Sequence, residues 1–464
     1  MRRHHLDHND CKETPMKEIS TDVVIIGAGM AGLTAATQLI AAGRDVVVLE
    51  ARDRVGGRVH SEIHDDCLVE VGGQWIAPDQ EKLLALLDGL GLETYSRYRE
   101  GKNVYVNGSG ENRQYEGEIF PASPETESEI VRLIELLDKL SHEIDPAQPW
   151  EHPNASEFDS VSFASWLQQQ SQDQEARDNI ALFVAGAMLT KPSYAFSLLQ
   201  ALMMAASAGG FNELVDPDFI LDKRVKGGMH QVPQGLAERV GFENIHLSTD
   251  VKSIVTAEGN VTVTAENLSV QAKHVIIALG PHLLTRIDFQ PALPSVKQQM
   301  AQHLSSGQVI KVQAFYPSAF WREKGLSGTA FSPYQTVHEA YDNTPHDYVG
   351  GTLVGFVSDH VADDLYAKDP TERKKAILDS FAAYFGEGAL KPTVYYESDW
   401  VNEVYTRGAY GTSFDIGGLT RYRDSIRSSV GRIHFACSDI AGIGYTHIDG
   451  AIRMGEAAAE AVLA

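Results

Sequence analysis

The sequence predicts an α/β fold in which a Rossmann-like domain, built from separated segments, is interleaved with a second domain of mixed sheet and helices. Near the start, "TDVVIIG", "MAGLTAATQLIAAG" and "DVVVLEA" have the patterns of a buried strand, a helix and a second buried strand. Such a βαβ unit implies a parallel sheet. A further buried strand, "HVIIALG", lies in mid-chain, and the small-residue helix "HIDGAIRMGEAAAEAVLA" ends the sequence.

The remaining elements are expected in the following order. Residues 1–19 read as a disordered arm, with order beginning at Thr21. Residues 93–226 are mostly helical by pattern, short strands with turns occupy about 244–280, and strands and helices alternate over 307–405. The sequence thus predicts a Rossmann-like domain of residues 20–92, 227–300 and 404–464, and a second domain of residues 93–226 and 301–403.

Composition and charge narrow the function classes. The chain has 464 residues, with 39 basic against 63 acidic side chains and a formal charge of −24. Such a surface repels nucleic acid and anionic membrane and attracts cationic small molecules, although an ordinary soluble surface would look the same. No apolar run reaches the roughly 20 residues of a membrane span, and no signal peptide is recognisable.

The cysteines and the N-terminal histidines carry weaker signals. Three cysteines form no pairing pattern, which favours a reducing, cytoplasmic location. His4, His5 and His8 could contact a metal, but a disordered arm is the simpler interpretation, so no metal site is predicted.

A glycine-rich turn between the first strand and its helix carries the clearest ligand signal. Gly27, Gly29 and Gly32 form G-x-G-x-x-G. In this motif the glycines permit a tight turn, a close approach of backbone to a pyrophosphate, and close packing of helix on strand. Glu50 ends the second strand, where a carboxylate can accept hydrogen bonds from ribose hydroxyls. The pattern predicts a dinucleotide, either NAD or FAD.

The residues after Glu50 favour FAD. In "ARDRVGGR", Arg52, Gly56, Gly57 and Arg58 offer a second close approach of backbone, with arginines beside it. A simple NAD domain does not need this feature. The alternative is a surface turn.

One strand contains a residue that does not fit it. In "GQVIKVQAFY", Lys311 lies among apolar side chains. An edge strand with Lys311 in solvent would explain the pattern, because lysine is rarely buried without a partner. A buried ammonium would instead require a partner or a function, since its burial costs several kcal/mol.

These motifs resemble the flavin amine oxidases, the family of the monoamine and polyamine oxidases. "GAGMAGL", "LEARDRVGGR", "GGQWIAP", "KGGMHQVPQGL", "VIIALGP" and "GRIHFACSDIAGIGYTHIDGAIRMGEAAA" are similar to its cofactor segments, and the resemblance covers nearly the whole chain from Thr21. It implies FAD, an interleaved two-domain fold and oxidation of a C–N bond with O2. The residues that it assigns to the cofactor are Gly27, Ala28, Gly29, Met30, Ala31, Gly32, Glu50, Ala51, Arg52, Gly57, Arg58, Gly72, Gly73, Gln74, Trp75, Val251, Ser438, Asp439, His447 and Ile448.

The resemblance also assigns catalytic residues around the flavin ring. Lys311, which is followed by the "FW" pair Phe320-Trp321, would hold a water against the flavin and stabilise the superoxide formed from O2. Tyr410 and His447 would form a slot for the amine, where the family normally has two aromatic rings. For His447 the alternative is a helix-start histidine that bonds to backbone.

Two small residues bear on how the flavin is held. Ala409 stands where members with covalently attached flavin carry a cysteine, so FAD is expected to bind non-covalently. Cys437 replaces a glycine of the family pattern and is interpreted as a small core residue.

Segments such as "YDNT" and "RGAYGTSFDIGGLTRY" are similar to members that oxidise short diamines. Such a substrate needs a neutral amine near the flavin and a carboxylate for its other, protonated end. Glu339 is the candidate carboxylate, with Asp342 and Glu213 as less favoured stand-ins, and Gln74 is a further substrate contact. The alternative for Glu339 is a solvent-facing side chain.

The function implied is FAD-dependent deamination of putrescine to 4-aminobutanal, ammonia and hydrogen peroxide by a cytoplasmic enzyme, with a homodimer as the expected assembly. Its partners would be the cationic diamine and O2. Oxidation of another amine stays open, whether cadaverine, a longer polyamine or a monoamine. A flavoprotein without enzymatic activity and an NAD-linked dehydrogenase also stay open.

Overall fold

The computed structural model describes residues 16–117 and 120–464. Most of the predicted arm of residues 1–19, including its three histidines, lies outside the described residues. Where the description begins, the prediction of disorder is wrong: β1 (Lys17–Ser20) pairs in parallel with β14 (Leu268–Ala272). Backbone hydrogen bonds at a sheet edge order this polar segment, and its own sequence gives no sign of them.

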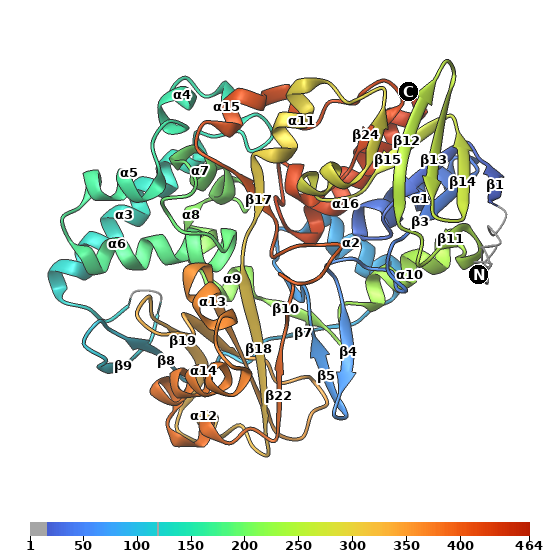
Figure 1. Ribbon diagram of the computed structural model, residues 1–464. Coiled ribbons are helices and arrows are strands. Elements are labelled where there is room, and N and C mark those ends of the chain that lie inside the picture. Colours follow the sequence, from blue (N-terminus) through green and yellow to red (C-terminus); the bar gives the residue numbers. More distant parts are fainter. Residues whose placement is uncertain (1–15, 118–119) are drawn as a thin grey trace, which may run out of the picture.

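A five-stranded parallel sheet carries the predicted βαβ unit (Figure 1). Its order is β11-β3-β2-β15-β24, with β2 (Val23–Ile26), β3 (Val46–Leu49), β11 (Ile245–His246), β15 (His274–Ile277) and β24 (Ile433–Phe435). Helix α1 (Met30–Ala41) connects β2 to β3 as predicted, and it packs against α10 (Gln231–Val240) and the terminal helix α16 (Ile448–Leu463). Strands β2 and β3 are wholly apolar and buried, as is typical of parallel strands with both faces covered.

A second sheet has the order β1-β14-β13-β12-β16. Its further strands are β12 (Val251–Ala257), β13 (Asn260–Ala265) and β16 (Asp288–Gln290). With β11 and β15, these strands confirm the predicted series of short strands over about 244–280.

Helices form most of the region after residue 120. They are α3 (Pro124–His142), α4 (Ala155–Phe158), α5 (Phe163–Gln170), α6 (Gln174–Ala181), the π-helix η2 (Leu182–Leu189), α7 (Leu198–Ser207), α8 (Phe211–Val215) and α9 (Pro217–Ile220). These helices confirm the prediction that residues 93–226 are mostly helical, but the region begins with strands: β7 (Thr94–Ser96), β8 (Lys102–Val106) and β9 (Asn112–Tyr115). The physical reason is visible in "KNVYV", whose last three residues are buried inside a sheet.

That sheet has seven strands in the order β22-β18-β21-β20-β19-β8-β9. Its other strands are β18 (Val309–Tyr316), β19 (Leu326–Phe331), β20 (Glu339–Asp342), β21 (Gly351–Ser358) and β22 (Val394–Glu397), and its helices are α12 (Phe320–Glu323), α13 (Asp359–Tyr366) and α14 (Pro370–Phe385). Strand β18 is hydrogen-bonded on both sides, to β21 and β22. Lys311 is therefore not on an edge strand.

Two small sheets join the predicted domains: β6 (Trp75–Ile76) and β7 flank β10 (Lys223–Val225), and β17 (Leu304–Ser306) pairs with β23 (Thr412–Phe414). A third, β4 (Ser61–His64) with β5 (Cys67–Glu70), lies within the first predicted segment. The parallel sheet uses only residues of the three predicted Rossmann-like segments, and the seven-stranded sheet only residues of the other two. The division into two domains stays a proposal that these sheets support.

The remaining helices are short connectors. They are α2 (Glu81–Leu90), α11 (Ser295–Gln302), α15 (Gly418–Tyr422), and the 3-10 turns η1 (Pro149–Glu151), η3 (Phe242–Asn244), η4 (Pro281–Arg286), η5 (Glu387–Leu390), η6 (Arg423–Ile426) and η7 (Ser438–Ile440).

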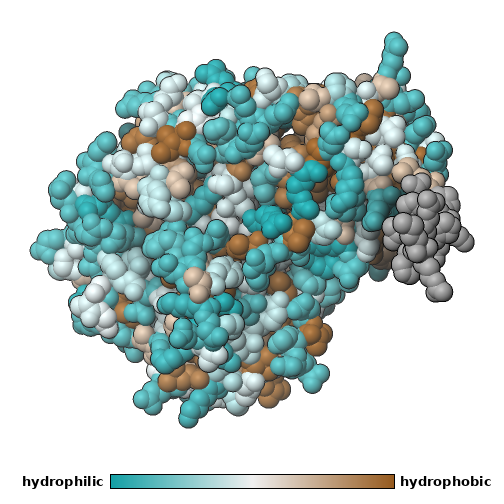
Figure 2. Space-filling view, in the orientation of Figure 1, coloured by the Kyte–Doolittle hydropathy of each residue, from teal (hydrophilic) through white to brown (hydrophobic). Residues whose placement is uncertain are grey.

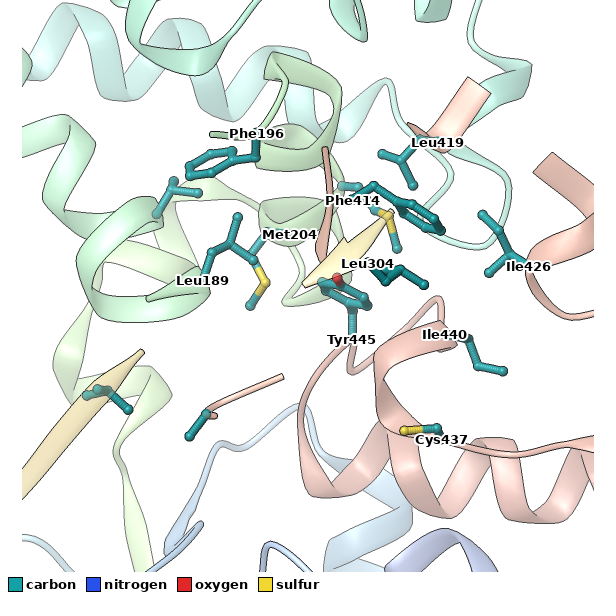
Figure 3. Close-up of a cluster of buried hydrophobic side chains, with 14 of the residues drawn as sticks. Leu189, Phe196, Met204, Leu304, Phe414, Leu419, Ile426, Cys437, Ile440 and Tyr445 are labelled. Carbon is teal, nitrogen blue, oxygen red and sulfur yellow. The ribbon is translucent and has the colours of Figure 1, made fainter. Parts of the chain in front are cut away.

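One hydrophobic core crosses between the regions. In Figure 3, Leu189 and Met204 of the helical region lie near Leu304, Phe414 and Tyr445 of the segments that lead to the C-terminus. All five belong to one cluster of buried side chains. Because close-packed interiors deform little, this core holds the elements around the site in fixed relation.

The face shown in Figure 2 is mostly hydrophilic, with hydrophobic residues in scattered groups. Within residues 16–117 and 120–464, no helix combines the length and the apolarity that crossing a membrane would require.

Candidate active site

A cavity of about 330 Å³ lies where the parallel sheet, the helices η2 to α9 and the seven-stranded sheet meet. The site residues predicted from the sequence line this cavity, except Ala28 and Gly32. Both exceptions are buried at the base of the β2–α1 turn, where they support the turn and do not face the cavity.

The three motif glycines of this turn have different physical roles. Gly27 has a φ of 103°, which favours glycine, and a Cβ there would lie 2.8 Å from the Ala278 carbonyl oxygen. A Cβ on Gly32 would lie 2.0 Å from the Gly27 carbonyl oxygen, so helix and strand can approach only because Gly32 has no side chain. A Cβ on Gly29 would meet no atom within 4 Å. The space beside Gly29 is open, as the close approach of a pyrophosphate requires.

The second strand presents its carboxylate as predicted. Glu50 is 3% exposed, and its two oxygens accept hydrogen bonds from the Ala28 N–H (2.7 Å) and the Arg52 N–H (2.9 Å). These bonds fix the carboxylate at the cavity wall. Arg52 donates through Nη2 to Thr406 Oγ1 (2.5 Å), while its buried Nε has no hydrogen-bond partner among the residues described.

Arg58 and the buried Asp439 form an ion pair in the same wall. Arg58 Nη2 lies 2.6 Å from Asp439 Oδ1, and Nη1 donates to the Tyr410 carbonyl oxygen at 2.8 Å. Burial raises the pKa of Asp439, but the Arg58 charge and hydrogen bond outweigh it and lower the pKa to about 2. Asp439 is thus ionised, and Arg58 is oriented by it.

Cys437 departs from its predicted role as a plain core residue. It is buried, but it also lines the cavity and accepts a hydrogen bond from Arg58 Nη2 at 3.3 Å. Burial, followed by the Asp439 charge, raises the pKa of the thiol to about 12, so it stays protonated.

Lys311 is buried and paired with neutral oxygens. It is 4% exposed, and Nζ donates to the Gly72 carbonyl oxygen (2.8 Å) and to Gln74 Oε1 (2.7 Å). The Trp75 ring lies 5.4 Å from Nζ. Burial lowers the pKa of Lys311 to about 7. The interpretation that places Lys311 in solvent is therefore wrong.

Gln74 holds Lys311 in place. Its Oε1 accepts from Lys311, and its Nε2 donates to Asn343 Oδ1 at 2.6 Å, while Asn343 donates to Gln313 Oε1 at 3.1 Å. Both ends of the Gln74 amide are thus engaged by the protein, although its side chain lines the cavity.

Strand register places four cavity residues in one row across the seven-stranded sheet. Lys311 of β18 pairs with Phe356 of β21, Phe356 with Glu339 of β20, and Glu339 with Phe331 of β19. All four line the cavity. Because neighbouring strands lie about 4.8 Å apart, the backbones of Lys311 and Glu339 are about 10 Å apart, with Phe356 on the strand between them.

Glu339 is at the carboxylate end of this row. It is 5% exposed, so it does not face solvent, and its Oε2 accepts a hydrogen bond from the Tyr341 hydroxyl at 2.8 Å. Asp342 and Glu213, the two less favoured candidates, do not line the cavity. Asp342 is instead bound by Arg322 at 2.7 and 2.9 Å.

Tyr410 and His447 both line the cavity. His447 also fits its alternative interpretation: it is the N-cap of α16, and its Nδ1 lies 2.8 Å from the Tyr445 carbonyl oxygen. The Tyr410 ring centroid lies 6.0 Å from that of Phe356. Burial, and then the Glu339 charge, raise the pKa of Tyr410, so its phenol is neutral. Their pairing as a slot stays a prediction.

The sequence reasoning missed the apolar wall and several polar residues of the cavity, among them Tyr341 and His282. Tyr341 could have been found, because it lies two residues after Glu339 and so points to the same face of the strand. His282 and the apolar residues give no signal that differs from an ordinary core. The missed wall residues include Phe183, Ala187, Met188, Leu214, Ile220, Leu221, Phe331 and Phe356.

The residues present fit a dinucleotide at one end of the cavity. The open space beside Gly29, the fixed Glu50 carboxylate and the cationic Arg52 side chain all line this end of the cavity, as phosphates and ribose would need. Beyond them, the buried ammonium and carboxylate lie in an apolar chamber. This combination defines a class of redox enzymes that hold a dinucleotide beside a chamber for a small charged substrate.

The chain belongs to the flavin containing amine oxidoreductases, whose family model matches residues 30–463. It is 53% identical to putrescine oxidase of Kocuria rosea over 96% of this chain and 95% of that protein. It is 32% identical to human flavin-containing amine oxidase B over 95% of this chain and 86% of that protein.

Solved structures of amine oxidases also match this chain closely. Wild-type putrescine oxidase bound to putrescine matches with a TM-score of 0.95 and 52% identity, covering 96% of this chain and all of that one. Cyclohexylamine oxidase from Brevibacterium oxydans matches with a TM-score of 0.91 and 31% identity, covering 95% and 98%. The cofactor is therefore FAD, and the interpretation as an NAD-linked dehydrogenase is wrong.

Proposed function

We propose that this enzyme oxidises putrescine with O2 and water to 4-aminobutanal, ammonia and hydrogen peroxide. The observation that carries the proposal is the row in which Glu339 and Lys311 stand two strands apart with Phe356 between them. A short diamine can place one ammonium on the carboxylate and its other end near the flavin. The putrescine oxidase similarity and the putrescine-bound structure of that protein support the same substrate.

The residues of this chain would act by binding and orienting. Glu339, held by Tyr341, binds the distal ammonium, and the apolar wall holds the methylene chain and excludes water. Tyr410 and His447 flank the amine that reacts. When bound, FAD would accept the two electrons and the hydrogen that leave the α-carbon of the amine, and O2 would then reoxidise it to give hydrogen peroxide. Lys311 would offer its N–H donors where the oxygen becomes anionic, and its positive charge as well at pH values below its pKa of about 7.

The test is a panel of monoamines, diamines and polyamines of graded length, with peroxide as the readout. We expect the rate to peak at the four-carbon diamine. Glu339→Gln should lower kcat/KM for putrescine by about 30-fold or more, because losing a desolvated charge partner costs about 2–5 kcal/mol. Its effect on n-butylamine, which has no distal ammonium, should be small.

The matched control is Glu213→Gln, because Glu213 does not line the cavity. If Glu339→Gln oxidises putrescine as well as the parent, the role of Glu339 fails. A peak at cadaverine, a longer polyamine or a monoamine would assign the enzyme to that amine. No peroxide with any amine would leave a flavoprotein without oxidase activity.

Three further proposals accompany this function. FAD binds non-covalently, because Ala409 at the cavity wall offers no thiol, so acid precipitation should leave the flavin in solution. A cytoplasmic location, inferred from the cysteine pattern, is checked by cell fractionation. A homodimer, inferred from the family resemblance, is checked by light scattering after size-exclusion chromatography.

A further inference from the structure

His338 is a buried histidine beside Glu339 that the proposed function does not use. Its Nε2 lies 3.6 Å from Glu339 Oε1, and the two side chains are 8% and 7% exposed. Within the described residues this Nε2 has no hydrogen-bond partner. Because Tyr341 holds Oε2, Oε1 is the oxygen left for a cation, and His338 stands next to it.

The surrounding structure keeps His338 in this position. Its N–H donates to the Phe356 carbonyl oxygen at 3.1 Å, and its carbonyl oxygen accepts from the Ser332 N–H at 2.9 Å. The ring also packs on the π-helix η2, where a Cβ at Gly186 would lie 3.6 Å from His338 Cδ2. His338 does not line the cavity, so it contacts the carboxylate from outside.

The other titratable groups near this pair are three tyrosines and Arg97, whose guanidinium lies 5.3 Å from the Tyr341 ring centroid. Tyr341 is on β20, Tyr384 is on α14 with its hydroxyl on the Val337 carbonyl oxygen, and Tyr410 precedes β23; burial, and then the Glu339 charge, raise the pKa of Tyr341 and Tyr410. Strand β21 and η2 carry no titratable side chain. Among the described residues, no basic group other than His338 lies within 4.0 Å of the Glu339 carboxylate.

We propose that His338 sets the preference of this site for diamines over monoamines. Neutral His338 leaves the Glu339 charge to the distal ammonium of the substrate, whereas protonated His338 pairs with that charge and weakens ammonium binding. Protonation of His338 and binding of the diamine therefore weaken each other, because both use the charge of the Glu339 carboxylate. His338 is a positioning residue that acts through Glu339, and the inference rests on the role proposed for Glu339.

The experiment compares putrescine with n-butylamine, which has the same carbon number but no distal ammonium. The measured quantity is the ratio of their kcat/KM values, because it largely cancels the ionisation of the reacting amine. Between about pH 8 and 5, where histidines gain their charge, the ratio should fall about 5- to 150-fold in the parent. In His338→Gln it should stay within about twofold.

His360→Gln is the matched control, because His360 is an exposed histidine paired with Asp359 on α13. It should keep the parental profile. Flavin absorbance and thermal unfolding report whether His338→Gln folds, and His338→Asn replaces it if it does not. A ratio that is flat in the parent, or that falls equally in the His338 variant, overturns the proposal.

Glu339→Gln separates this inference from the proposed function. If Glu339→Gln leaves the ratio unchanged at about pH 8, Glu339 does not bind the distal ammonium. The proposed role of Glu339 and the inference about His338 then both fail. If Glu339→Gln lowers the ratio while the His338 variant keeps the parental pH profile, only the inference about His338 fails.

Discussion

At the scale of single residues, the Lys311 ammonium is held by two neutral oxygens inside an apolar strand. Those acceptors, Gly72 O and Gln74 Oε1, offset only part of the cost of removing the charge from water. Burial therefore lowers the pKa of Lys311 from its ordinary 10.5 to about 7, with Arg224 acting in the same direction and Glu70 against it. Such a residue persists where function compensates for its cost.

This lowered pKa predicts how stability depends on pH. Between about pH 7 and 10 the unfolded chain binds a proton at Lys311 that the folded chain does not, so the free energy of unfolding rises with pH over this window. Lys311→Met removes that rise, which amounts to a few kcal/mol. Lost packing in Lys311→Met lowers the free energy of unfolding equally at every pH, so the slope with pH is the quantity that reports the titration of Lys311.

Thermal unfolding of the holoenzyme at several pH values measures this slope. Lys375→Met, on the exposed face of α14, should keep the parental slope. Equal slopes for Lys311→Met and the parent would show that Lys311 titrates normally.

At the scale of elements, two glycines of the β2–α1 turn have different roles: Gly29 makes room for the cofactor, and Gly32 allows the helix to pack. Gly29 has a φ of −78°, which alanine also adopts, and its Cβ direction is open toward the cavity. Gly32 faces the Gly27 carbonyl oxygen, and any side chain there collides with backbone.

The two glycines should therefore respond differently to the same substitution. Gly29→Ala should raise the Kd for FAD about tenfold or more, since a methyl group takes space needed by the pyrophosphate, with the thermal midpoint of the apoprotein unchanged. Gly32→Ala should lower the apoprotein midpoint by about 1–3 degrees, because a backbone collision costs about 1–3 kcal/mol and a chain of this length shifts by about one degree per kcal/mol.

Flavin fluorescence titration of the apoprotein measures the Kd, and calorimetry measures the midpoint. Parental FAD affinity in Gly29→Ala would contradict the phosphate cradle. An unchanged midpoint in Gly32→Ala would contradict the packing argument.

At the scale of the whole molecule, local sequence pattern predicted the elements whose signals lie within a short stretch. It missed the features that depend on contacts between residues far apart in the chain. The β2–α1–β3 unit and its glycines were predictable because each signal lies within a short stretch. Strand β1 was not, because its order comes from pairing with β14 far along the chain. Phe331 and Phe356 were missed because only sheet register brings them beside Glu339. His338 escaped because its burial against η2 is a tertiary contact.

The net charge of −24 gives the last prediction, which concerns the enzyme as a whole. A strongly acidic surface attracts a dication over a distance set by the Debye length, about 30 Å at 0.01 M salt and 8 Å at 0.15 M. Raising the salt over this range should lower kcat/KM for putrescine about tenfold, with kcat nearly unchanged and a smaller effect for n-butylamine, which carries one charge. Glu339→Gln should show the same salt slope as the parent, because the long-range field comes from the surface and not from the buried carboxylate. A salt-independent kcat/KM, or a slope that disappears in Glu339→Gln, would place the attraction inside the cavity instead.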